Sequence, residues 1–315
     1  MRRTKVQTKK EPEAEKLYGR RADVKYSLHL LKMNPIVLAG FIISVASILI
    51  AILSHLLVSP TAWEAQNLDL RLCWNNPAFN WGIQNVFNCS GSVFPIGTDQ
   101  YGRSLLLMMI LAIPIDLQIA LEVVLSAVVI GVIFGSIAAY MGGIVDELIL
   151  RITDVFLAVP GILLAIVMIV VMGRSLPVLT LAVLITWWPF YVRLVRSQVL
   201  GEKERPYVER LHAMGAGPGR ILFLHIVPNS IYPLLVQATL DIGSVILTVS
   251  ALTFIGLTPS PLLPELGNLA NQGIQYLFTA PWLILFPGIT ILVISLGFNL
   301  LGDGIRDIFD PRLRR

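Results

Sequence analysis

The sequence predicts an all-α integral membrane protein with six transmembrane helices and both termini in the cytoplasm. Composition is the first observation behind this prediction: of 315 residues, 55% are hydrophobic and 14% charged, whereas soluble domains carry about 25% charged residues. The second is that the apolar runs are continuous and of helix length, unlike the short alternating strands of a membrane β-barrel. The third is the uneven distribution of lysine and arginine along the chain.

Six apolar runs come close to the roughly 20 residues that a transmembrane helix needs. The run 104–140 is too long for one simple span, so the span is placed at 116–140, and 104–115 is expected to be an apolar lead-in. The first run has too long an apolar core for a cleaved signal peptide. The expected spans are residues 36–58, 116–140, 155–172, 176–194, 231–257 and 281–301.

The basic residues predict which side of the membrane each loop occupies. Of 24 lysines and arginines, all except Arg71, Arg103 and Arg174 fall on the side that carries both termini. Because positive charge concentrates on the cytoplasmic side, the basic N-terminus is interpreted as a cytoplasmic flank rather than a tail that binds nucleic acid. The predicted segments are cytoplasmic 1–35, the first span 36–58, extracytoplasmic 59–103, a core of five further spans 104–301 containing a cytoplasmic loop 200–229, and a cytoplasmic tail 302–315.

The long external loop holds the only two cysteines of the chain, Cys73 and Cys89. A cysteine pair outside the cytoplasm favours a disulfide, and two free buried thiols are the alternative. Asn88 begins the sequence Asn88-Cys89-Ser90, so it is a candidate glycosylation site.

Sequence motifs for catalysis are absent from the chain. It has no phosphate-binding G-x-x-x-x-G-K-[ST] loop, no H-E-x-x-H, no C-x-x-C and no G-x-S-x-G, and its four histidines are scattered. These absences leave a transporter, a channel or a membrane scaffold, and we expect neither catalytic residues nor a metal site.

The stretch 207–217, YVERLHAMGAG, is unusually polar for this chain. Pro206 suits the first turn of a helix, where Glu202 and Glu204 are also expected. Gly215 suits a left-handed C-terminal cap. The spacing of Tyr207, Leu211 and Met214 gives one apolar stripe. The sequence therefore predicts an amphipathic helix of about three turns outside the membrane, which lies on lipid or docks in the groove of a partner.

Residues 207–229 resemble the EAA loop of ABC importer permeases. The resemblance is carried by Tyr207-Val208-Glu209, by Gly215 six residues later, and by His225-Ile226-Val227-Pro228-Asn229. In that family the loop forms a coupling helix that inserts into a groove of a cytoplasmic ATPase. The small alanines of the family pattern are here Arg210 and Leu211. The resemblance assigns ATPase coupling to Tyr207, Glu209, Leu211, Met214, Gly215 and Ala216.

Other stretches resemble the C-type permease subunit of dipeptide and oligopeptide importers, from about residue 20 to the end. The outer loop, about 60–95, matches weakly. The matching stretches are Gly97-Thr98-Asp99-Gln100-Tyr101-Gly102-Arg103, Tyr140-Met141-Gly142-Gly143-Ile144-Val145-Asp146, Trp188-Pro189-Phe190-Tyr191-Val192-Arg193, Ala280-Pro281-Trp282, Gly302-Asp303-Gly304 and Asp310-Pro311-Arg312.

The resemblance implies a type I ABC importer permease fold in the cell membrane and a function as half of a translocation pathway. It also implies a homologous second permease, two ABC ATPases that hold ATP and magnesium, and an extracytoplasmic solute-binding protein. No cofactor is expected in this chain. The expected substrates are di- and oligopeptides, with oligosaccharides or nickel complexes as alternatives.

Three acids fall within or at the edge of the expected spans: Asp116, Glu122 and Asp241. Because charge inside a membrane is costly, all three are candidate residues of the translocation pathway. Glu122 and Asp241 could equally contact helices of the second permease, and both interpretations remain open, whereas Asp116 is expected near the outer membrane boundary. A proton-coupled secondary transporter that uses Glu122 and Asp241, or a scaffold, is the rival function. At the start of the third span, Arg151 and Asp154 are expected to form a local ion pair or a helix cap.

Overall fold

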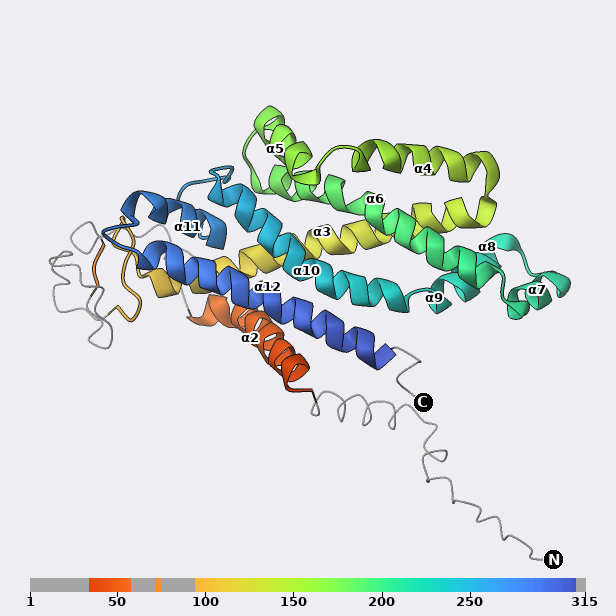
Figure 1. Cartoon of the computed structure of the whole chain (residues 1–315), viewed down its shortest axis with the longest axis horizontal. Coiled ribbons are helices and arrows are strands. Elements are labelled where there is room, and N and C mark those ends of the chain that lie inside the picture. The colour runs from red at the N-terminus through yellow and green to blue at the C-terminus, as the bar shows by residue number, and fades with distance from the viewer. Residues whose placement is uncertain (1–33, 58–71, 75–93, 310–315) are drawn as a thin grey trace, which may run out of the picture.

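The computed structural model describes residues 34–57, 72–74 and 94–309, and these form a helical bundle without β-strands (Figure 1). Five helices are long and apolar enough to cross a membrane. They are α2 (Pro35–Leu57), α3 (Leu105–Met141), α6 (Leu176–Lys203), α10 (Tyr232–Phe254) and α12 (Trp282–Phe309).

Helix α3 differs from its prediction. It is one continuous helix of 37 residues, so the expected lead-in 104–115 is its first part and not a separate segment. Pro114 lies inside it without ending it. A proline is tolerated within a transmembrane helix when neighbouring groups compensate for the lost backbone hydrogen bond. Helix α2 covers the first expected span, 36–58, as far as Leu57.

The third expected span, 155–172, is not one helix. Helix α4 (Gly143–Leu157) and helix α5 (Gly161–Met172) are bent by 80° at the short break between them, where Pro160 precedes α5. Proline lacks an N–H group and disfavours a helical residue before it, which accounts for the break. Since 12 residues of helix extend only about 18 Å, α5 alone is shorter than the roughly 30 Å hydrocarbon core. A sixth membrane span, in addition to the five long helices, therefore requires α4 and α5 together.

Helices α3, α6, α10 and α12 lie side by side, with α4 and α5 along one face and α2 beside α12 (Figure 1). At one end, the α7 end, lie α7 (Pro206–Ala213), α8 (Pro218–Ile221), η3 (Leu222–Ile226) and α9 (Val227–Asn229). At the opposite end, the α11 end, lie α11 (Leu266–Gly273) and η4 (Ile274–Tyr276), which were not predicted.

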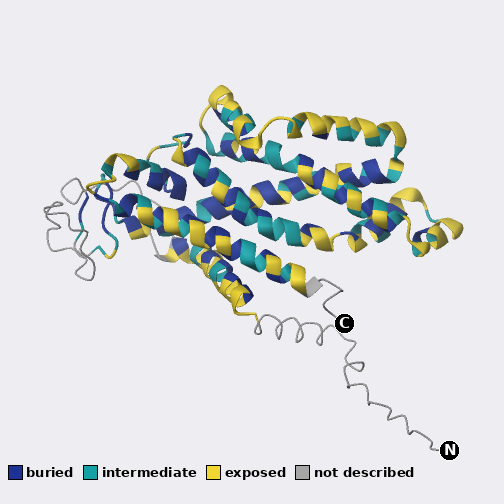
Figure 2. Ribbon diagram, viewed as in Figure 1, coloured by how far each residue is buried: buried dark blue, intermediate teal, exposed yellow. Residues whose placement is uncertain are grey.

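Glycines allow several helices to approach closely. A Cβ at Gly40 would lie 2.5 Å from the Cβ of Leu300, and one at Gly243 would lie 2.6 Å from the carbonyl oxygen of Ser295. Small residues at helix contacts are typical of membrane bundles. Large apolar side chains such as Leu125 and Val129 are exposed. Exposed residues recur along the long helices, as expected for a protein surrounded by lipid (Figure 2).

Candidate functional site

Helix α7 is a short, well-capped helix at the end of the bundle. Pro206 occupies its first turn, and Gly215 adopts the left-handed conformation expected from the sequence, with φ +76°. The Gly215 N–H donates to the carbonyl of His212 at 2.9 Å, and the Ala216 N–H donates to that of Leu211 at 3.1 Å. These two bonds form a Schellman cap, so glycine ends the helix after about two turns.

The acids that precede α7 differ from the prediction. Helix α6 continues to Lys203, so Glu202 lies in the last turn of α6 and Glu204 caps it. Glu202 is buried and accepts hydrogen bonds from the Tyr207 hydroxyl at 3.0 Å and from Arg205 Nε at 2.8 Å. The assignment of both acids to the first turn of α7 was wrong because the polar residues after the span extend α6.

The inner face of α7 packs against its own bundle. Val208 is buried, and Tyr207 and Leu211 are partly buried against the same cluster. The cluster consists of Ala139, Val195, Val199, Val208, Ile221, Leu222, Ile226 and Leu234. The predicted stripe was therefore partly wrong: two members face inward, while Met214 is 73% exposed. The pattern missed Val208, which lies between Tyr207 and Leu211 in the sequence and is the most deeply buried residue of α7.

The outer face of α7 is polar and open to a partner. Glu209, Arg210 and His212 are exposed beside Met214. Tyr207 fixes the base of the helix, because its hydroxyl also accepts a bond from Asn229 Nδ2 at 3.3 Å. Partial burial raises the pKa of Tyr207 above its ordinary value, so the hydroxyl remains a donor at neutral pH.

Ion pairs connect α4 to α6. Arg196 donates through Nε and Nη2 to the carboxylate of Asp146 at 2.5 and 2.6 Å. Arg193 pairs with Asp154. The predicted Arg151–Asp154 pair was wrong, because α6 brings Arg193 to Asp154 and Arg151 contacts Glu147 at 3.4 Å.

At the α11 end, Asp116 is buried and connects α3 to α11. Its Oδ2 accepts the Leu266 N–H at 3.2 Å. Beside it lies Glu265, which caps α11 by accepting the N–H groups of Gly267 and Asn268 at 3.1 and 2.7 Å. Burial raises the pKa of Glu265 above its ordinary value. Sequence reasoning missed Glu265 because it predicted no helix at Leu266–Gly273, where an acid before the first turn is favourable.

Asp241 is also buried inside the bundle. It accepts hydrogen bonds from the Tyr191 hydroxyl at 2.7 Å and from Gln237 Nε2 at 3.0 Å. The carboxylate thus joins α10 to α6 within this chain. Asp116 and Asp241 both make contacts between helices of this chain, a role that the sequence analysis did not predict.

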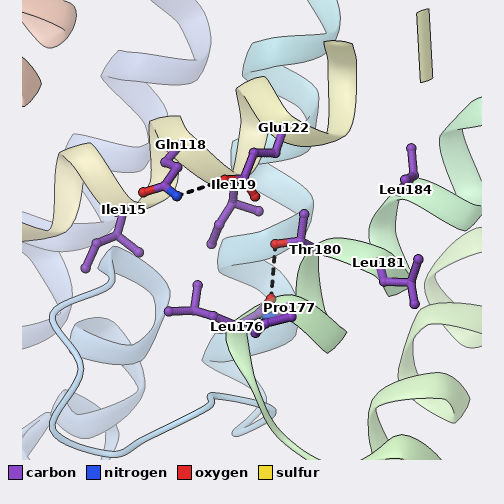
Figure 3. Close-up of a pocket in the computed structure, with 9 residues that line it drawn as sticks. All are labelled: Ile115, Gln118, Ile119, Glu122, Leu176, Pro177, Thr180, Leu181 and Leu184. Carbon is purple, nitrogen blue, oxygen red and sulfur yellow. Dashed lines mark hydrogen bonds between the residues drawn. The ribbon is translucent and has the colours of Figure 1, made fainter. Parts of the chain in front are cut away.

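Of the three acids, Glu122 lines a cavity that Asp116 and Asp241 do not line (Figure 3). The cavity has a volume of about 440 Å³ and lies between α3 and the first turns of α6. Glu122 is exposed and accepts a hydrogen bond from Gln118 Nε2 at 2.8 Å. The lining residues are Ile115, Gln118, Ile119, Glu122, Leu176, Pro177, Thr180, Leu181 and Leu184. Within the described ranges there is no group of three or more residues that could hold a metal ion.

A compact turn precedes α3 at the α11 end. Arg103 donates from its backbone N–H and its Nε to the carboxylate of Asp99 at 2.9 and 2.6 Å, and both side chains are buried. Trp282 Nε1 donates to the Thr98 carbonyl at 3.2 Å, which ties the turn to α12. Cys73 is disulfide-bonded. The other predicted loop residues, Cys89 and Asn88, lie outside the described residues.

The sequence pattern of the family described as binding-protein-dependent transport system inner membrane component matches residues 131–315. The chain belongs to this family. The matched part of this binding-protein-dependent permease covers α4 to α12, including α7, the Arg196–Asp146 pair and Glu265. Family membership and the apolar helices identify a multi-pass cell-membrane protein.

Curated relatives match the permease over most of its length. It is 37% identical to a dipeptide transport system permease protein of Alkalihalophilus pseudofirmus over 90% of this chain and 88% of the relative. It is 36% identical to an oligopeptide transport system permease protein of Bacillus subtilis over 70% of this chain and 72% of the relative. It is 38% identical to a glutathione transport system permease protein of Pectobacterium atrosepticum over 70% of this chain and 73% of the relative.

Proposed function

We propose that the chain is a permease subunit of an ATP-driven importer of dipeptides and oligopeptides. It pairs with a homologous second permease, and each subunit forms half of the translocation pathway. Two ABC ATPases hold ATP and Mg²⁺, so this chain needs no cofactor and catalyses no reaction itself. A binding protein delivers the peptide from outside. The family description and the dipeptide, oligopeptide and glutathione permease relatives support this proposal.

The distribution of charge supports an orientation with the α7 end in the cytoplasm. The positively charged loops predicted from the sequence include 200–229, which contains α7. The start of α2 and the end of α12 lie close together, since a Cβ on Gly304 would touch Val37. An arrangement with both termini on one side agrees with this proximity.

The observation that carries the proposal is that α7 has one face fixed to the bundle and one face free. Val208 is 1% exposed, whereas Glu209 and Met214 point away from the cluster that buries it. A partner that binds the free face can therefore move the helix without unfolding it. We assign that face to the groove of an ATPase.

One hydrogen bond connects α7 to the end of α6, and two more connect α6 to α3. Tyr207 bonds Glu202 at the end of α6, and Lys203 Nζ donates to the Ala139 and Tyr140 carbonyls at the end of α3. When ATP draws the two ATPases together, a displaced α7 would shift α6 and α3 through these bonds. Alternating access of the pathway follows from that shift, because α3 and α6 border the Glu122 cavity.

The proposal is tested by reconstituting the chain with its second permease, two ATPases and binding protein in vesicles. We expect uptake of trialanine that requires ATP and every subunit. Uptake that follows a proton gradient without the ATPases would instead establish the secondary transporter. Assembly without uptake of any solute would establish the scaffold. Uptake of maltotriose in place of trialanine would establish the oligosaccharide importer.

A further inference from the structure

The cavity between α3 and α6 places one carboxylate in otherwise apolar surroundings. Ile115, Ile119 and Leu181 line it together with Glu122, whose carboxylate borders the open space (Figure 3). Gln118 and Thr180 are the other polar side chains of the cavity. The Thr180 hydroxyl donates a hydrogen bond to the Leu176 carbonyl at 3.0 Å. The cavity therefore offers a ligand one negative charge and several apolar contacts.

Glu122 has no charge partner within the described chain. The ion pairs among the described residues all involve other acids. Gln118 donates one neutral N–H bond, which does not balance the negative charge. Because Glu122 lies near the middle of α3, an apolar helix of 37 residues, an unbalanced carboxylate there is costly unless a cation from outside the chain meets it.

The other two acids of the spans contrast with Glu122. Asp241 accepts two hydrogen bonds in a closed site, and Asp116 is buried against the start of α11. Neither is among the residues that line the cavity. Their contacts account for them as links between helices. Among the described residues, the hydrogen-bond partner of Glu122 is Gln118, one turn away on its own helix.

We propose that Glu122 binds the primary ammonium group of a peptide's amino terminus during its passage. This inference rests on the proposed function and adds the chemical group that the permease recognises. A primary ammonium has three N–H donors and a positive charge, and a carboxylate pairs with it directly. The cavity volume of about 440 Å³ suits a small ligand, and Ile115, Ile119 and Leu181 would contact its first apolar side chains.

The test compares two cargoes that differ only in the ammonium group. Trialanine carries it, and propionyl-dialanine has hydrogen in its place. ATP-driven uptake of each is measured with the whole complex, at saturating binding protein and cargo, in vesicles of phosphatidylcholine and phosphatidylglycerol. These lipids contain no primary ammonium. For Glu122→Gln we expect uptake of trialanine to fall about tenfold while uptake of propionyl-dialanine stays unchanged.

A second measurement keeps the test independent of the binding protein. Equilibrium binding of fluorescent trialanine, labelled at its carboxyl end, to the detergent-solubilised complex of permeases and ATPases without binding protein should weaken about tenfold in Glu122→Gln. Glu147→Gln is the matched control, since Glu147 is an exposed acid on α4 outside the cavity. It should leave uptake and binding unchanged.

Three outcomes would overturn the inference while leaving the proposed function intact. An equal loss for both cargoes would make Glu122 a contact with the second permease. A defect that appears only when phosphatidylethanolamine is added would assign the carboxylate to a lipid headgroup. Wild-type behaviour of Glu122→Gln in both measurements would remove it from the pathway. Failure of the wild-type complex to transport trialanine with ATP would instead reject the proposed function.

Discussion

The Tyr191 hydroxyl donates a 2.7 Å hydrogen bond to the Asp241 carboxylate, and this bond joins α6 to α10 inside the bundle. Both side chains are buried. Tyr191 also lies against α3, because a Cβ at Gly131 would come within 2.5 Å of its own Cβ. One polar contact thus fixes the place where three of the long helices meet.

Replacing Tyr191 by phenylalanine should destabilise the bundle. The variant removes a donor and leaves the buried Asp241 carboxylate with Gln237, so we expect a loss of about 1–2 kcal/mol in unfolding free energy. Urea or thermal unfolding in detergent measures it. The double variant Tyr191→Phe with Asp241→Asn should lose less than the sum of the single variants. Additive losses would show that the bond contributes nothing.

Replacing Arg196 by lysine should weaken the contact between α4 and α6. Lysine keeps the charge but cannot form both bonds to Asp146, so we expect a loss of about 1 kcal/mol. Arg151→Lys is the matched control, because its single contact to Glu147 is 3.4 Å long and exposed. Thermal unfolding of the two variants measures both losses, and equal stabilities of the two variants would contradict a stabilising role of the Arg196–Asp146 pair.

Two substitutions should separate the fixed face of α7 from its free face. Val208→Ala removes buried contacts and should cost about 2 kcal/mol of unfolding free energy. Met214→Ala, at an exposed site, should change stability by less than about 0.5 kcal/mol. By the proposed function, Met214→Ala should still reduce the amount of ATPase that copurifies. Normal ATPase recovery with Met214→Ala would place the docking contact elsewhere.

Glu265 should make stability depend on pH. Burial raises its pKa above the ordinary 4.5, so the folded protein holds this proton more tightly than the unfolded chain. The protonated Glu265 therefore contributes fully to the free energy of unfolding below pH 4.5, and this contribution is lost as pH rises through the folded-state pKa. We expect Glu265→Gln to flatten the fall in melting temperature between pH 4.5 and 8. The exposed-site control Glu147→Gln should follow the wild type, and parallel curves for all three proteins would contradict the assignment.

The sequence alone determined the membrane class and most of the spans. A helix in lipid must satisfy its backbone internally and present apolar side chains over about 20 residues, so its signal is contiguous in the chain. The cap of α7 was predictable for the same reason, because the conformational freedom of Gly215 and the fixed φ of Pro206 act locally. The motif resemblance led to the family, which the comparisons confirmed.

Only the tertiary structure decided which side chains meet. Val208 faces the bundle, Asp154 pairs with Arg193, and Glu265 lies beside Asp116, although each pair of partners comes from segments distant in sequence. Pro160 accounts for the break between α4 and α5, but only the structure gives the 80° angle between these helices, both of which contact α6. Periodicity places a residue on a face of its helix, but which face becomes buried depends on the helices that pack against it.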